Sequence, residues 1–206
     1  AELNALIAEL EATRAGSTLA LQVDLRDVET LAGLVASAGD RFGRLDALIN
    51  NASAFYPTPL ATATPEQWDE LFSANVRAPF FLAQAAAPRL AECSGAIVNI
   101  ADLYAEHPLP QHSIYCMSKA ALAMMTKSLA RDLGPDVRVN AIAPGAVLWP
   151  DSGKASAERE AIIERTPLKR MGTPEDVAST VLWLLRDATF VTGEMIRVDG
   201  GRHLGM

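Results

Sequence analysis

Three side chains between residues 102 and 119, in the stretch DLYAEHPLPQHSIYCMSK, have the types and spacing needed to move a proton. Tyr115 and Lys119 stand four apart, so on a helix they share a face. An ammonium group near a phenol stabilises phenolate, which would let the tyrosine exchange a proton with a substrate near neutral pH. Asp102 precedes this pair, and its charge would raise the pKa of the phenol again. The Y-x-x-x-K spacing alone also arises by chance, so other residues must decide.

Polar and turn residues mark several further positions. Asn75 interrupts the apolar helical sequence ANVRAPFFLAQAA, where an amide either serves a site or bends the helix and bonds a carbonyl. Asp24, NNAS (50–53), Asp102 and Pro144-Gly145 each end an apolar segment. If those segments are parallel strands, these residues meet at one edge of the sheet, where α/β proteins bind ligands.

The elements that must position these residues alternate along the chain. Short apolar segments typical of strands occupy residues 17–25, 45–52, 95–102, 137–145 and 194–201. Between them lie helical patterns, two of which begin with the capping sequences TPEQW (64–68) and TPEDVA (173–178). A third helix carries one apolar stripe and ends before Gly134-Pro135: Leu122, Met125, Leu129 and Leu133. This alternation predicts an α/β fold, a doubly wound parallel sheet covered on both faces.

Composition narrows the functional class. The 206 residues are 50% hydrophobic and 21% charged, which is typical of one globular domain. The net charge of −7 and the scattered basic residues give no reason to expect a nucleic-acid partner or an anionic membrane surface. Apolar runs are too short for a membrane helix. Cys93 and Cys116 lack metal spacing and are expected to be buried free thiols, so we expect a cytoplasmic protein without a metal site.

A dinucleotide-binding sheet should open with a strand, a glycine-rich turn and a helix N-terminus that holds the pyrophosphate. The sequence has no G-x-G-x-x-G motif and starts inside a helical pattern. Either the fold binds no dinucleotide, or its first βαβ segment belongs upstream of Ala1.

Several motifs in order along the whole chain favour the second explanation. NNA at 50–52, Asn75, Tyr115-x-x-x-Lys119, Pro144-Gly145 and VTGEMIRVDGG (191–201) resemble the short-chain dehydrogenase/reductases. The resemblance implies a Rossmann-like sheet of seven strands, of which this chain holds the last five. Residues 1–206 would then form a single reductase domain that is N-terminally incomplete.

The resemblance also implies site residues. Tyr115 would donate the proton, Lys119 would hold the nicotinamide ribose and lower the pKa of Tyr115, and Asn75 would fix a water in the proton relay. The implied cofactor is NADPH, although the basic residues that choose it over NADH would lie upstream. The residues implied to contact the cofactor, besides Tyr115 and Lys119, follow the strands: Asp24, Leu25, Asn51, Ala52, Ser53, Pro144 and Gly145.

Asp102 departs from the common family pattern, which has a serine that donates to a substrate carbonyl. An ionised carboxylate cannot donate that bond, but it can relay a proton toward a ring nitrogen while keeping Tyr115 protonated. NNASAFYPTPL (50–60) resembles the pteridine reductase branch, in which Phe55 would stack on a pterin. Trp149 would form a pocket wall, and Val147 replaces a serine found in some members. Phe55 as a loop anchor and Trp149 as surface packing are the alternatives.

We therefore predict NADPH-dependent reduction of a dihydropterin, such as dihydrobiopterin or dihydromonapterin, or of dihydrofolate. One rival is a reductase of other carbonyls, such as 3-oxoacyl thioesters, and another is a non-catalytic nucleotide binder. A homotetramer is implied by resemblance, with AQAAAP (83–88) and SKAALAMM (118–125) as contact faces and the tail 200–206 near a neighbour's site. The alternative for both faces is packing inside the chain.

Overall fold

A four-stranded parallel sheet forms the centre of the protein. The structure is a computed structural model that describes residues 2–148 and 156–206. Its strands are β1 (Ala47–Asn50), β2 (Ala96–Ile100), β3 (Arg138–Pro144) and β4 (Met195–Val198), in the order β1-β2-β3-β4. All three neighbouring pairs are parallel. Four of the predicted strands are therefore confirmed, each shorter than its apolar segment.

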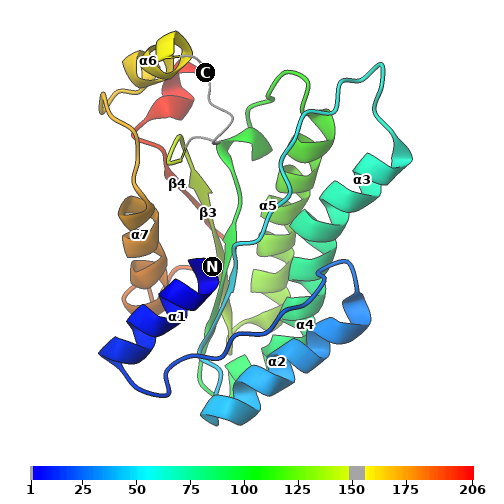
Figure 1. The fold of residues 1–206 in the computed structure, drawn as a ribbon, viewed down its shortest axis with the longest axis vertical. Helices are drawn as coiled ribbons and strands as arrows, with labels where there is room; N and C mark the ends of the chain where they lie inside the picture. Colours follow the sequence, from blue (N-terminus) through cyan, green and yellow to red (C-terminus); the bar gives the residue numbers. More distant parts are fainter. Residues whose placement is uncertain (1, 149–155) are drawn as a thin grey trace.

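Helices cover both faces of this sheet, as the alternating pattern predicts (Figure 1). Helix α4 (Ala78–Ala91) and helix α5 (Ser113–Leu133) lie on one face with α2 (Val28–Phe42), and α7 (Pro174–Arg186) lies on the other. The remaining helices are α1 (Glu2–Thr13), α3 (Pro65–Phe72) and α6 (Ser156–Arg165). Short 3₁₀ turns span Leu103–Ala105 and Arg202–Gly205.

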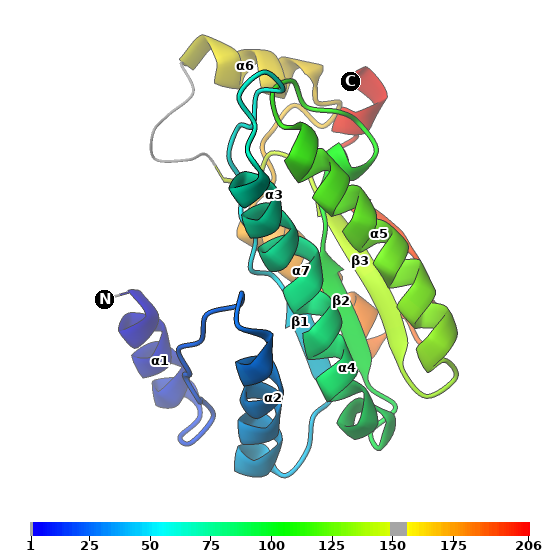
Figure 2. The same cartoon turned by 90° about the vertical axis from the view of Figure 1, so that its right-hand side faces the viewer.

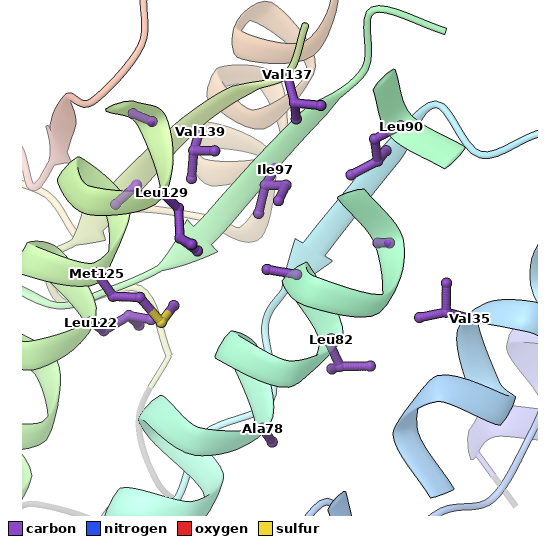
Figure 3. Packing of buried hydrophobic residues seen from close by; sticks show 14 of the residues in the cluster. Val35, Ala78, Leu82, Leu90, Ile97, Leu122, Met125, Leu129, Val137 and Val139 are labelled. Atoms are coloured by element: carbon purple, nitrogen blue, oxygen red, sulfur yellow. The ribbon is translucent and has the colours of Figure 1, made fainter. Parts of the chain in front are cut away.

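Alternation along β2 divides the core into two layers. Ile97 points toward α4 and α5, and its neighbour Val98 packs with Leu184 of α7. Figure 3 shows the larger layer, in which Leu122, Met125 and Leu129 of α5 face the strand residues. The predicted stripe of α5 is thus confirmed as its buried face, with Leu133 only partly buried at its end. This packing fixes α5, and with it the first turn that carries Tyr115.

The predicted helix starts are confirmed. Thr64 accepts a hydrogen bond from the backbone N–H of Gln67, whose side chain accepts from the backbone N–H of Thr64. Thr173 and Asp176 form the same reciprocal box at the start of α7. Each box satisfies two N–H groups that the first helical turn leaves without partners.

The prediction of a strand over residues 17–25 is wrong. The segment forms no regular structure and pairs with no strand in the described part of the chain, and a strand forms only when its backbone groups find a ladder partner. Leu19 and Leu21 are accordingly 40% and 42% exposed. Figure 2 shows the preceding helix α1 at one side of the molecule, far from α5.

Two smaller expectations can be compared with the structure. Cys93 and Cys116 are free, but both are half-buried rather than buried. Among the described residues, no helix combines the length and apolar character required to cross a bilayer.

Candidate active site

Asp102 and Tyr115 touch. Asp102 follows β2 and caps the 3₁₀ turn, where its Oδ1 accepts a hydrogen bond from the backbone N–H of Tyr104 at 2.9 Å. Its Oδ2 accepts from the hydroxyl of Tyr115 at 2.6 Å. The carboxylate therefore performs a structural capping role and contacts the phenol at the same time, because its two oxygens face different groups.

The electrostatic environment keeps the phenol protonated. Burial raises the pKa of Tyr115, and the charge and hydrogen bond of Asp102 raise it further. Burial also raises the pKa of Asp102, against the bonds that it accepts. We expected Lys119 to lower the pKa of Tyr115, but the pKa is raised, because desolvation of the phenol and the contact with Asp102 both raise it.

Lys119 is nearly fully buried beside this pair. Its Nζ lies 5.8 Å from the centre of the Tyr115 ring and donates to the backbone oxygen of Ile100 at 2.9 Å. Burial lowers the pKa of Lys119 to about 8. An ammonium group has three donors, so the bond to Ile100 leaves capacity for the hydroxyls of a ribose. The donor set here fits the nicotinamide ribose that the sequence suggests.

Asn75 lies in a π-helical turn, Ser73–Arg77, between α3 and α4. Its Oδ1 accepts from Ser53 Oγ at 3.0 Å and from the backbone N–H of Ala54 at 2.9 Å. Its Nδ2 donates to the backbone oxygen of Ala54 at 3.0 Å and to Ser118 Oγ at 2.9 Å. The amide thus ties the loop after β1 to helix α5, which is the structural role that the sequence left open for it. Sequence reasoning missed Ser118, although its place between Tyr115 and Lys119 was a signal.

Phe55 packs at the site rather than under its own loop. Its ring stacks on His112 with centroids 4.9 Å apart and meets the Tyr115 ring edge-on at 4.7 Å. A cavity of about 470 Å³ opens beside it. The cavity walls combine apolar side chains with four polar ones: Phe55, Asp102, Leu103, Tyr104, Leu109, His112, Pro144, Gly145, Ala146, Leu148 and Arg202. Sequence reasoning missed Tyr104, His112 and Arg202.

The residues expected to contact the cofactor do not all lie at this cavity. Asn51, Ala52 and Ser53 follow β1 and are exposed, while Pro144 ends β3 and Gly145 follows it, both at the cavity. Asp24 and Leu25 border a separate shallow surface depression. The guanidinium of Arg26 pairs with Asp24 at 2.7 Å and lowers the pKa of that carboxyl to about 2. Trp149 lies outside the described residues.

The family model described as Enoyl-(Acyl carrier protein) reductase matches residues 1–203. The chain belongs to the short-chain dehydrogenase/reductases. Its motifs, parallel sheet and Tyr115–Lys119 helix agree with this membership, so the protein is an oxidoreductase of a family that uses NAD(P)H. None of the relatives and structures named below is described as a pteridine reductase.

Curated relatives carry ketoacyl reductase names. A Streptomyces violaceoruber protein, named as a candidate ketoacyl reductase of the granaticin polyketide synthase, is 39% identical over 90% of this chain and 77% of its own. The 3-oxoacyl-[acyl-carrier-protein] reductase FabG of Thermotoga maritima is 34% identical over 87% of this chain and 74% of its own. Among solved structures, a Brucella melitensis short-chain dehydrogenase/reductase, titled SDR:glucose/ribitol dehydrogenase, is 32% identical with a TM-score of 0.87. That match covers 97% of this chain and 81% of the other.

Proposed function

We propose that this reductase uses NADPH to reduce a dihydropterin, such as dihydrobiopterin or dihydromonapterin, at a ring C=N bond. The observation that carries the proposal is the Asp102 carboxylate, which lines a cavity with Phe55 and accepts a hydrogen bond from the Tyr115 hydroxyl at 2.6 Å. A ring nitrogen needs a proton as its neighbouring carbon is reduced, and a carboxyl–phenol pair can supply one. An aromatic wall suits a flat heterocycle, since stacking contributes about 1 kcal/mol beyond area burial.

The bound cofactor would supply the hydride. In the proposed mechanism Tyr115 delivers its phenol proton to the substrate nitrogen, and the phenolate that is left takes a proton from the adjacent Asp102 carboxyl. Because burial raises the pKa of Asp102, this carboxyl can itself hold a proton and pass it on. Lys119 would orient the ribose from its buried position, and Asn75 would keep the loop of Ser53 in register with α5.

On the dinucleotide side, we propose that Asn51, Ala52 and Ser53 line the cofactor and that Pro144 and Gly145 approach its amide. Asp24 would meet the adenine amino group only by sharing or exchanging its bonds to Arg26. Leu25, next to it, would contribute apolar contact.

The second candidate is reduction of 3-oxoacyl thioesters, which the names of the relatives favour. A carbonyl substrate needs a hydrogen-bond donor at residue 102, and a protonated Asp102 could provide one. The carboxylate has no advantage there over the serine common in the family, so the geometry favours the pterin.

Oxidation of NADPH by the purified protein, followed with dihydrobiopterin and separately with acetoacetyl-CoA, tests the choice. Higher kcat/KM with dihydrobiopterin is the expected result. Turnover of acetoacetyl-CoA alone would replace the first proposal with the second, and turnover of neither would favour a non-catalytic binder.

We also propose that the protein is a homotetramer. On α5, Met117 and Met124 are 43% and 61% exposed and lie about two turns apart on an outward face. The 83–88 segment supports this less than expected, because Ala83 and Ala86 are buried in the chain's own core. Light scattering at micromolar concentration should give four times the mass of the chain, and a monomer would contradict the proposal.

A further inference from the structure

Arg202 is a cation in the active-site cavity that the proposed mechanism does not use. It stands in the 3₁₀ turn after β4, at the end of the sheet where α6 and the C-terminus lie (Figure 1). The residue is half-buried and lines the same cavity as Asp102 and Phe55. Its Nη2 donates to the hydroxyl of Tyr104 at 3.3 Å, which is a long bond to a neutral partner.

Nearby arginines differ from it. Arg197 on β4 pairs with Glu106, and Arg170 pairs with Asp176. Among the described residues, no acidic side chain forms an ion pair with Arg202. A guanidinium carries five N–H donors in a fork that matches an oxyanion, so the bond to Tyr104 leaves donors of Arg202 available to an anion in the cavity.

The backbone around Arg202 is held from two sides. The buried carboxylate of Asp199 accepts from the backbone N–H of Gly201 at 2.9 Å and from the backbone and ring N–H groups of His203 at 2.8 and 2.7 Å. Gly200 and Gly201 adopt positive φ values, and a Cβ at either would come within 2.9 Å of Thr166 or Pro167. The turn is therefore a fixed support for the backbone at Arg202, whose side chain lines the cavity.

The charge of Arg202 also reaches the proton-transfer pair. Burial raises the pKa of Asp102, and Arg202 is among the groups that oppose this rise. An anion bound at the guanidinium would therefore lie within electrostatic range of the site.

We propose that Arg202 is a specificity-determining residue that binds an oxyanion, a carboxylate or a phosphate, carried by the substrate away from its reducible group. This rests on the proposed function in so far as the cavity is the substrate site. A carboxylate would come from the glutamate tail of a dihydrofolate, and a phosphate from the coenzyme A part of an acyl thioester. The shared chemistry is recognition of a negative group by the guanidinium fork.

The experiment uses the complete natural protein as wild type, Arg202→Gln and the control Arg186→Gln. Arg186 is an exposed arginine at the end of α7, paired with Asp187 and absent from the cavity lining, so its variant removes the same charge elsewhere. The quantity measured is the ratio of kcat/KM for an anionic and a neutral substrate. One pair is dihydrofolate and dihydrobiopterin, and the other is acetoacetyl-CoA and ethyl acetoacetate. Calorimetric Kd values for folate and biopterin give the same ratio without turnover.

Arg202→Gln should lower the anionic-to-neutral ratio by on the order of tenfold or more, mainly through KM, as expected for the loss of a charge-assisted hydrogen bond. Arg186→Gln should keep the wild-type ratio. An equal loss for both members of a pair would assign Arg202 a structural role through Tyr104 and overturn the proposal. An unchanged ratio, or no preference for the anionic member in the wild type, would overturn it as well.

The two proposals fail separately. If the wild type reduces neither pterin, the pterin function is wrong, while the thioester pair and the folate Kd still decide the role of Arg202. A loss with the folate and biopterin pair would indicate a carboxylate ligand, and a loss with the thioester and ester pair would indicate a phosphate ligand.

Discussion

The proposed proton-donor side of the site and its proposed dinucleotide side are built differently. Tyr115, Lys119 and Asn75 are 3%, 2% and 1% exposed, and each is held by hydrogen bonds to the chain itself. Asn51, Ala52 and Ser53 are exposed, and Asp24 is held at the surface by the side chain and the backbone N–H of Arg26. The residues of the proposed proton-donor side are thus held in place by the fold, whereas those of the proposed dinucleotide side are exposed to solvent.

This difference separates polar groups that are already bonded within the folded core from exposed groups that are available to a ligand. A buried polar group must be satisfied within the chain, since leaving it unpaired costs about 1–3 kcal/mol. Substitutions on the proton-donor side should therefore affect stability or chemistry strongly. Substitutions on the dinucleotide side should mainly affect binding.

The largest effect should follow removal of the acid. Tyr115→Phe keeps the ring that packs on Phe55 but loses the hydroxyl bonded to Asp102. We expect turnover to fall by on the order of 10²–10⁴, the usual share of general acid catalysis, with NADPH and pterin affinity retained. Steady-state kinetics and equilibrium binding check this, and wild-type turnover would remove Tyr115 from the mechanism.

A large loss of stability should follow removal of the amide that joins the two sides. Asn75→Ala deletes four hydrogen bonds and leaves Ser118 and the backbone of Ala54 without their partner. We expect the free energy of unfolding to fall by about 2–4 kcal/mol, measured by urea denaturation. Ser53→Ala is the matched control, since it removes one of these bonds and should cost less. Equal losses in the two variants would contradict the bridging role of Asn75.

The pH dependence should change when the carboxylate loses its charge. Burial lowers the pKa of Lys119 to about 8, and the charge of Asp102 opposes that shift. In Asp102→Asn the opposing charge is gone, so the pKa of Lys119 should fall further, because a lone buried ammonium is less stable. If activity requires the charged ammonium, the alkaline limb of kcat/KM should move to lower pH than in the wild type. An unchanged or higher midpoint would show that this limb belongs to another group.

The smallest effect on the free protein should come from the dinucleotide side. Asp24→Ala removes an ion pair between exposed side chains, and such pairs contribute little to stability. The melting temperature should stay close to that of the wild type, while the Kd for NADPH rises. A clear drop in melting temperature with unchanged NADPH affinity would reverse the assignment of Asp24.

The parts of the fold that follow from local sequence were predictable. The capping boxes at Thr64 and Thr173 and the stripe on α5 depend on residues a few positions apart, and four strands follow from continuous apolar runs. The 17–25 segment has the same apolar character, yet a strand also requires a partner, which composition does not encode.

The candidate site divides in the same way. The Tyr115–Lys119 pair could be predicted because residues four apart share a face of a helix. Asp102 could be predicted because it ends an apolar segment typical of a strand. Tyr104, His112 and Arg202 reach the cavity from a 3₁₀ turn, a loop and the C-terminal turn, whose positions depend on tertiary packing. The upward shift in the pKa of Tyr115 likewise depends on burial and on a contact that spacing does not reveal.

The most direct test of the central claim is Asp102→Ser, assayed with dihydrobiopterin and with acetoacetyl-CoA beside a melting curve. If the carboxylate serves a ring nitrogen, pterin reduction should fall by on the order of tenfold or more, as expected on losing a positioned proton-relay group. Reduction of the thioester should hold or rise, because a serine hydroxyl donates to a carbonyl and does not repel phenolate. If Asp102 only caps the turn through Tyr104, both activities should fall together with the melting temperature. An unchanged pterin rate in a stably folded variant would contradict the account.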